Sequence, residues 1–547
     1  MIINLPRSRR TRSARWSAAL VVTAGLLATL APAASAADST TYLEGVTGVG
    51  DVAAGGGKVF VAARDRIVVA DTDGAVTGAV TGLSGADGLA LTPDGSRLFA
   101  ALSGSNQVAE INVADLTVTR RIDLAAYPCP THLSLSGDRL WVGYGCTFGG
   151  VLSLDVSAAT PQPTRIVSDM HGAPLVAAAG DTVVLGESGI SQSDLLVFDV
   201  STTPPTRRGI IEDDPYSANL EDLTITPDGS TAISAFGAAR WYTAWDTTSL
   251  AKVRTYGVET GPEFSGYPIA LAISPDGSQV AGGRVSGPDV ALYDAATTTK
   301  TYTDDHPVGE LVPRTLAFSG ADVFGVLKEQ STGRFSLWRL AGATLPASAV
   351  SLTAPPSATA LEPLTVTGAL TLSGGTAPGA QPLVVTRKLP NGTSTTLPTV
   401  TTAADGTFTL TDTPPTGGAI TYAALWDGSP GFRWSSTSVT LTVARHATSL
   451  TLSGPQNGKI GKQLALGGTL DIGGHPPAPL SYVKLVRTIT DDSGTTTVSR
   501  SVPLATDGSF STADSPRVNG QYAYTVEWAG DGATLPSQAN HTVTVKD

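Results

Sequence analysis

Cysteine, charged residues and long hydrophobic runs are scarce in this chain, and each scarcity excludes a class of protein. The two cysteines in 547 residues lack a Cys-x-x-Cys spacing, so metal binding by this pair is the weaker interpretation. No Gly-rich phosphate loop precedes a helix pattern, and no nucleophile elbow is present. With 15% charged and 41% hydrophobic residues, the composition favours folded modules over extended disorder.

The longest apolar run lies at the N-terminus. Five arginines precede residues 18–30, and the small residues 34–36 follow as a cleavage site, so residues 1–36 are predicted to be a signal peptide of the general secretion route. The run is short of the roughly 20 residues that a spanning helix needs. We therefore expect an extracellular or cell-surface protein, with no membrane insertion once the signal is removed.

The mature chain is acidic. Removal of the signal takes away five arginines and no acidic residue, which changes the formal charge from −12 to −17. Nucleic acid and anionic lipid would repel such a chain. We therefore expect no nucleic-acid partner.

A repeat organises the first part of the chain. Within residues 88–124, four runs of alternating apolar residues are separated by turn residues, which predicts a four-stranded antiparallel meander. A turn glycine recurs in similar contexts at intervals of 38 to 49 residues: Gly57, Gly95, Gly137, Gly180, Gly229, Gly277 and Gly320. Seven copies of a four-strand unit predict an all-β fold with a seven-bladed β-propeller over residues 38–345. Residues 38–46 are expected to add the missing fourth strand of the last blade.

Residues 88–124 closely resemble the YVTN-type repeat, a relative of the WD40 blade, and residues 223–258 and 271–303 resemble it more loosely. The resemblance implies a propeller fold. It implies little about activity, because propellers host many functions.

A second repeat follows the propeller. Residues 401–412 match residues 503–514, and Trp426 matches Trp528. A unit of about 100 residues with short alternating strands predicts a β-sandwich, so two tandem sandwiches are expected at residues 346–445 and 446–547.

The two sandwich segments resemble bacterial immunoglobulin-like (Ig-like) repeats, which end in a Tyr-x-x-x-Trp strand, a Gly-containing loop and a Val/Thr-rich last strand. Both segments lack cysteine, so packing alone must hold their cores. The two tryptophans are predicted to be core or loop-covering residues rather than ligand-stacking ones.

The two cysteines, Cys129 and Cys146, both fall in the third blade. In an exported chain such a pair favours a disulfide bond.

Propeller geometry predicts one candidate site. The loops that lead into each blade's first strand open around the central channel, together with the loops that join second and third strands. Aligning the seven blades on their first apolar residue places six side chains at this mouth: Asp51, Asp87, His132, Glu221, Asp222 and Arg314. Such a concave polar site predicts ligand binding; the alternative is that these are solvated loop residues that satisfy turn backbones.

No catalytic residue and no protein-held metal is predicted. The propeller histidines, His132, His171 and His306, are scattered over three blades. We expect no cofactor, although the mouth carboxylates offer the oxygen ligands of a weak Ca²⁺ site.

These observations favour a non-catalytic recognition or adhesion protein, secreted or held at the cell surface. Its propeller would bind a protein or a glycan, its Ig-like domains would act as spacers or adhesion modules, and we expect a monomer. Two alternatives stay open. One is a propeller enzyme of lactonase, lyase or glycan-cleaving type that uses the mouth carboxylates with a divalent cation; the other is a structural cell-envelope component.

Overall fold

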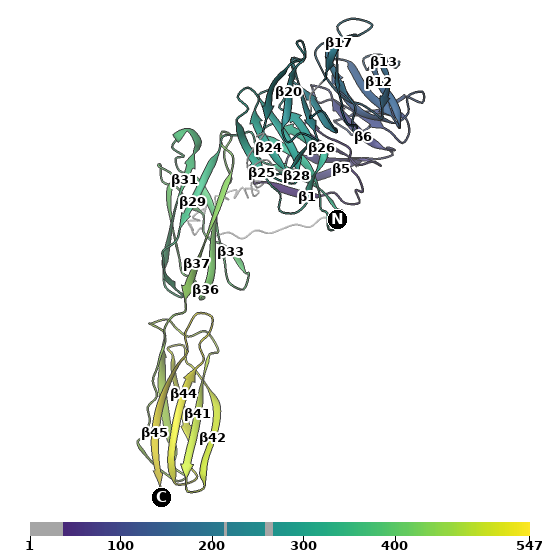
Figure 1. Ribbon diagram of the computed structural model, residues 1–547. Helices are drawn as coiled ribbons and strands as arrows, with labels where there is room; N and C mark the ends of the chain where they lie inside the picture. The colour runs from purple at the N-terminus through teal and green to yellow at the C-terminus, as the bar shows by residue number, and fades with distance from the viewer. Residues whose placement is uncertain (1–36, 213–215, 258–265) are drawn as a thin grey trace, which may run out of the picture. The chain divides into compact units, whose positions relative to one another are not determined.

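The computed structural model describes residues 37–212, 216–257 and 266–547, and strands dominate it (Figure 1). The predicted signal peptide lies outside these residues. Within them, the one helical element is a 3-10 turn at Ser373–Gly375, and no helix has the length and apolarity to cross a membrane. The all-β prediction is confirmed.

Among the described residues, the first part of the chain forms seven four-stranded antiparallel sheets. Sheets one to four contain β2 (Val52–Gly55), β3 (Lys58–Ala62), β4 (Ile67–Asp71) and β5 (Val76–Val80); β6 (Ala86–Leu91), β7 (Arg97–Leu102), β8 (Gln107–Asn112) and β9 (Val118–Asp123); β10 (Pro130–Ser136), β11 (Arg139–Gly145), β12 (Phe148–Asp155) and β13 (Thr164–His171); β14 (Leu175–Ala179), β15 (Thr182–Gly186), β16 (Leu195–Asp199) and β17 (Thr206–Ile211). Sheets five to seven contain β18 (Leu220–Ile225), β19 (Thr231–Phe236), β20 (Tyr242–Asp246) and β21 (Lys252–Tyr256); β22 (Tyr267–Ile273), β23 (Gln279–Val285), β24 (Val290–Asp294) and β25 (Lys300–Asp304); β26 (Glu310–Ser319), β27 (Asp322–Lys328), β28 (Phe335–Leu340) and β1 (Ser39–Tyr42).

The seven sheets close into a ring. The first strand of each sheet contacts the first strand of the next, from β2 through β6, β10, β14, β18 and β22 to β26, and β26 contacts β2. Apolar side chains fill the space between neighbouring sheets; Phe99 of β7, for example, packs with Val142 of β11, and both are fully buried. This ring of four-stranded sheets is a β-propeller.

Both ends of the propeller segment contribute to its last sheet. Strand β1 pairs antiparallel with β28, where Thr40 lies opposite Trp338. The pairing removes an open sheet edge. It confirms the expectation that the N-terminal segment supplies the fourth strand.

The seven turn glycines all have left-handed backbone conformations, with φ between 53° and 74°. Gly95 shows why a side chain is excluded: a Cβ atom there would lie 2.5 Å from the backbone nitrogen of Gly56 in the preceding sheet. The repeated glycines therefore mark turns whose left-handed backbone conformation favours glycine.

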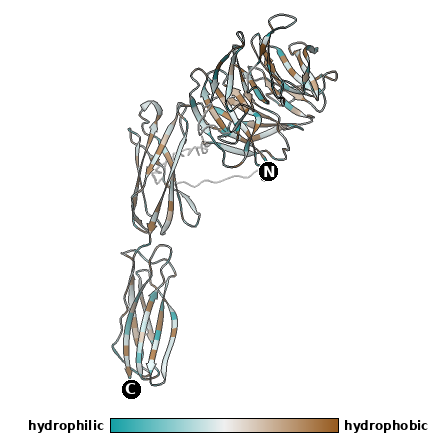
Figure 2. Ribbon diagram, in the orientation of Figure 1, coloured by the Kyte–Doolittle hydropathy of each residue, from teal (hydrophilic) through white to brown (hydrophobic). Residues whose placement is uncertain are grey.

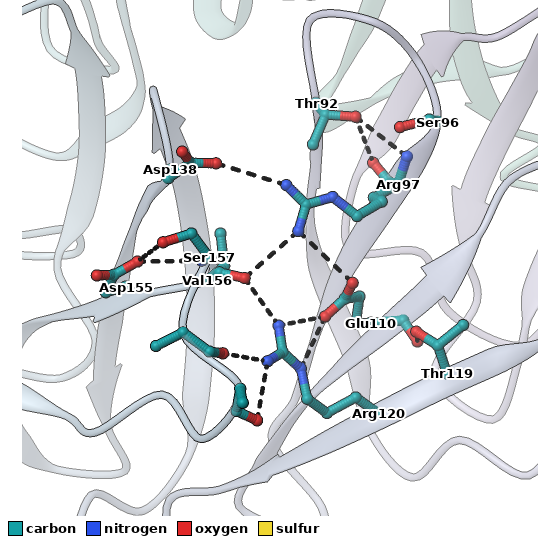
Figure 3. Close-up of polar contacts among 12 residues, drawn as sticks. Thr92, Ser96, Arg97, Glu110, Thr119, Arg120, Asp138, Asp155, Val156 and Ser157 are labelled. Atoms are coloured by element: carbon teal, nitrogen blue, oxygen red, sulfur yellow. Dashed lines mark hydrogen bonds and ion pairs between the residues drawn. The ribbon is translucent and has the colours of Figure 1, made fainter.

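An ion-pair cluster joins the second and third sheets (Figure 3). The Arg120 guanidinium binds the Glu110 carboxylate, with Nε 2.8 Å from Oε2, and Nη1 donates to the Ala158 carbonyl of the third sheet at 2.7 Å. Arg97 lies on the other side of Glu110, 3.6 Å away. Only 8% of Glu110 is exposed, so this carboxylate depends on its two arginine partners.

Two further parts of the chain each have two sheets around one core, with hydrophobic residues spaced along their strands (Figure 2). The first part has the sheet β29 (Ser348–Thr353), β31 (Leu364–Leu372) and β35 (Thr407–Asp412), and the sheet β30 (Ala358–Thr359), β37 (Ser435–Ala444), β36 (Gly418–Trp426), β32 (Pro382–Lys388) and β33 (Ser394–Thr396), with β34 (Val400–Thr401) beside β32. The second has β38 (Ser449–Leu450), β40 (Leu464–Asp471) and β43 (Ser509–Asp514), and β39 (Asn457–Lys459), β45 (Ser537–Lys546), β44 (Gly520–Trp528), β41 (Tyr482–Asp491) and β42 (Gly494–Pro503).

The two sandwiches repeat the same internal contacts. The Tyr422 hydroxyl donates to Asp412 at 2.6 Å, and the Tyr524 hydroxyl donates to Asp514 at 2.7 Å. Each aspartate also pairs with an arginine of the facing sheet. Trp426 and Trp528 are 2% and 7% exposed, so both are core residues, as predicted.

Candidate functional site

A cavity of about 330 Å³ lies in the channel of the propeller. Five of the six predicted mouth residues line it: Asp51, Asp87, His132, Asp222 and Arg314. They converge on the channel because all five lie on or next to innermost strands. Asp51 comes just before β2, Asp87, His132 and Asp222 lie near the starts of β6, β10 and β18, and Arg314 lies in the middle of β26. The sixth, Glu221, does not line the cavity; its carboxylate accepts a hydrogen bond from the Asn219 side chain. Whether the five bind a ligand stays a prediction.

Asp51 and Asp222 occupy equivalent positions and make equivalent bonds. In each, Oδ1 accepts the backbone N–H of the following residue, at 2.7 Å and 2.8 Å. The other oxygen accepts an N–H from the first strand of the next sheet: Leu89 at 2.8 Å for Asp51, and Leu271 at 2.6 Å for Asp222. These carboxylates therefore tie neighbouring sheets, which is the backbone-satisfying role considered as the alternative.

Burial raises the pKa of Asp51 and of Asp222 to about 7. The backbone N–H donors oppose the rise because they stabilise the charged form, and the Arg314 guanidinium opposes it too. Both carboxyls consequently exchange protons near neutral pH. An acid-base role would require a substrate to displace donors that each carboxyl already holds.

Unlike Asp51 and Asp222, the His132 and Arg314 side chains do not tie backbone N–H groups of neighbouring sheets. No hydrogen bond to the His132 imidazole is found among the described residues, and burial, followed by the positive charge of Arg314, lowers its pKa to about 3. The imidazole is therefore neutral at physiological pH and offers one donor and one acceptor. Arg314 donates from Nη1 to the Glu221 carbonyl at 3.2 Å.

Asp87 is held on both sides. Ser103 donates to its Oδ2 at 2.6 Å, and Arg64 forms an ion pair with its Oδ1. Asp87 is 4% exposed, whereas the Arg64 side chain is 53% exposed. The carboxylate of this ion pair is therefore buried, and its arginine is accessible to solvent.

The predicted disulfide is confirmed: Cys129 and Cys146 are bonded. The bridge joins the residue before β10 to the loop after β11. It therefore fixes the loops of the third sheet beside His132, which lies on β10.

The propeller has two different faces. The mouth face carries the loops that lead into first strands and the loops that join second and third strands. On or beside these loops lie exposed apolar side chains: Phe148 (71% exposed), Val308 (55%), Tyr216 (46%) and Tyr267 (46%). Phe148 packs edge-on against His171, and Tyr216 packs edge-on against Trp241. These residues were not predicted from the sequence, although their positions beside the same loops could have indicated them.

The opposite face, here called the turn face, carries the glycine turns. It also carries turns in which an aspartate side chain accepts hydrogen bonds from residues of the same turn. Oδ1 of Asp94 accepts from Thr92 at 2.5 Å and from the Ser96 backbone at 3.0 Å. These bonds lower the pKa of Asp94 to about 2, and the same pattern lowers that of Asp276. These carboxylates of the propeller therefore stabilise their own turns.

No family model and no curated protein matches the chain. Among solved structures, similarity extends to hydrazine synthase of Kuenenia stuttgartiensis (17% identity, 54% of this chain and 98% of that chain, TM-score 0.45). It also extends to the β-propeller domain of Cps50 (Swd1) from Myceliophteria thermophila (14%, 55% and 99%, TM-score 0.43) and to Hsv2p of Kluyveromyces lactis (10%, 53% and 96%, TM-score 0.37). At these identities and TM-scores, the similarity gives no information about the function of this chain.

Proposed function

We propose that this protein is an exported, non-catalytic recognition protein whose mouth face binds a protein or glycan at the cell surface. Its two sandwiches, which we propose to be Ig-like, act as spacers or adhesion modules. One observation supports this most: the face that opens into the polar cavity is also the face with exposed aromatic side chains.

The chemistry of the mouth face suits recognition. Aromatic rings offer large, rigid contact areas that stack on sugars or anchor a protein partner. A small number of polar groups in a concave site then fixes orientation, and His132 and Arg314 are placed to do so.

The same geometry favours binding over the enzyme alternative. Asp51 and Asp222 each accept two backbone N–H bonds, so neither is poised for substrate. Asp87 is engaged by Ser103 and Arg64.

Val308 and Val76 provide a matched test. Val308 lies in the loop before β26 on the mouth face, whereas Val76, 43% exposed, begins β5 beside a loop of the turn face. The mature chain would be screened on glycan arrays and in pull-downs with cell-wall preparations. Once a ligand is found, Val308→Asp and Phe148→Ala should weaken binding at least about fivefold, while Val76→Asp should not.

Loss of binding in the Val76 variant alone, or binding that survives all mouth-face changes, would contradict the proposal. Self-assembly of the mature chain, measured by light scattering at rising concentration, would instead support the cell-envelope alternative.

A further inference from the structure

Three side chains far apart in the sequence meet at the junction of the two sandwiches. Glu362 lies between β30 and β31, His446 follows β37, and His475 follows β40. Their potential ligand atoms all lie within 4.8 Å of one another. One carboxylate and two imidazoles are a donor set that suits zinc.

Two of the three distances between ligand atoms fit an ion's coordination shell. Nε2 of His446 and Nε2 of His475 each lie 3.2 Å from Oε1 of Glu362. Ligand atoms placed 2.0–2.1 Å from a tetrahedral Zn²⁺ are about 3.3 Å apart. These three side chains could therefore hold an ion with little rearrangement.

The hydrogen bonding of His446 points to a cation at the same place. Its Nδ1 lies 2.8 Å from the Ala447 carbonyl oxygen, which only accepts, so we assign the hydrogen to Nδ1. A neutral imidazole then directs the lone pair of Nε2 at a carboxylate oxygen. Two acceptors in contact require a proton or a metal ion between them, and a carbonyl bound to Nδ1 is the usual support of a metal-binding histidine.

The backbone holds His446 in place. Its N–H donates to the Ala533 carbonyl at 2.7 Å, and its carbonyl accepts from Leu535 at 2.8 Å. Gly473 leaves room for the ring: a Cβ atom there would lie 2.5 Å from Cε1 of His446. Only 14% of the His446 side chain is exposed, so this ligand is largely fixed before any ion arrives.

We propose that Glu362, His446 and His475 form a Zn²⁺ site, with a fourth position open to water. Nitrogen ligands favour zinc over Ca²⁺ and Mg²⁺, which take oxygen ligands. Glu362 belongs to the first sandwich and His475 to the second, so the ion crosslinks consecutive sandwiches and stiffens their connection. The proposal does not depend on what the propeller binds.

The test uses the mature chain, purified without a histidine tag and treated with a chelator. Zn²⁺ titration by calorimetry should give one ion per chain, and Co²⁺ should give the visible absorption of a tetrahedral site. His475→Ala and Glu362→Gln should each weaken Zn²⁺ binding more than about 100-fold. His541→Ala is the matched control, since His541 lies on β45 of the second sandwich and bonds the Pro455 carbonyl; its binding should be unchanged.

Circular dichroism would confirm that the variants fold. The wild-type titration is a readout that does not depend on any variant. Absence of Zn²⁺ binding or of the Co²⁺ spectrum would show a purely hydrogen-bonded His–Glu–His cluster and overturn the proposal. Binding that persists in both His475→Ala and Glu362→Gln, or is lost in His541→Ala, would overturn it as well.

Discussion

Replacing Asp222 by alanine tests whether the channel carboxylates hold the propeller together. Asp222 is 8% exposed and accepts two backbone N–H bonds, from Leu223 in its own strand and from Leu271 in the next sheet. Alanine removes both acceptors and leaves the donors buried at the cavity wall. The contact between the fifth and sixth sheets should therefore weaken.

The magnitude follows from the cost of an unsatisfied buried donor. Each orphaned N–H costs about 1–3 kcal/mol. For the Leu271 amide, a local opening free energy lowered by that amount corresponds to hydrogen exchange about 5- to 150-fold faster. Both bonds together should lower the stability of the propeller by about 2–6 kcal/mol.

Hydrogen-deuterium exchange with mass spectrometry, read at peptides that contain Leu271, would measure the effect. Glu221→Ala is the control because Glu221 is adjacent in sequence but its carboxylate bonds the Asn219 side chain. Unchanged protection at Leu271 in Asp222→Ala, or equal acceleration in both variants, would refute the assignment of Asp222 as a tie between sheets.

Three more predictions follow from the same contacts. The pKa of Asp51 and of Asp222 is about 7 in the folded protein and 3.8 in the unfolded chain. Their protonation therefore stabilises the fold fully below pH 3.8, and this stabilisation is lost as the pH rises through 7. Between these two pH values, the free energy of unfolding should fall by up to about 1.4 kcal/mol per pH unit for each group. Denaturant unfolding at several pH values should show a shallower decline in the Asp51→Asn/Asp222→Asn double variant, and an unchanged slope would contradict the assignment. Arg120→Ala leaves the buried Glu110 without its closest partner and should destabilise the propeller by about 3 kcal/mol in thermal unfolding; a loss below about 0.5 kcal/mol would place this pair among ordinary surface ion pairs. The Cys129→Ser/Cys146→Ser variant, in which a bridge between residues 17 apart is lost, should be about 3 kcal/mol less stable, and the same melting temperature with and without the bridge would count against it.

Much of the fold follows from local sequence patterns. Alternating apolar residues placed the strands, and turn glycines such as Gly95 marked the repeat because their left-handed backbone excludes a side chain. The pairing of β1 with β28 was also predictable, since the last sheet had three strands of its own and an open edge.

The candidate site was predicted in part. Period-two alternation within a strand sends adjacent side chains to opposite sides, so Glu221 and Asp222 could not both face the channel from a regular strand. A bulge between Leu220 and Asp222 shifts the register there, and Asp222 is the one that lines the cavity. No sequence pattern specifies the size or place of such a bulge.

The sequence by itself determined the strands, the turns, the repeat and the disulfide partners, because each depends on interactions among residues close in the chain or on a count of two cysteines. Only the tertiary structure decided that Asp222 bonds the Leu271 backbone 49 residues away, and that Glu362 meets His446 across 84 residues. Those contacts depend on how the sheets pack and on the register of their strands. The residues next to a side chain in the sequence do not specify which surface packs against it.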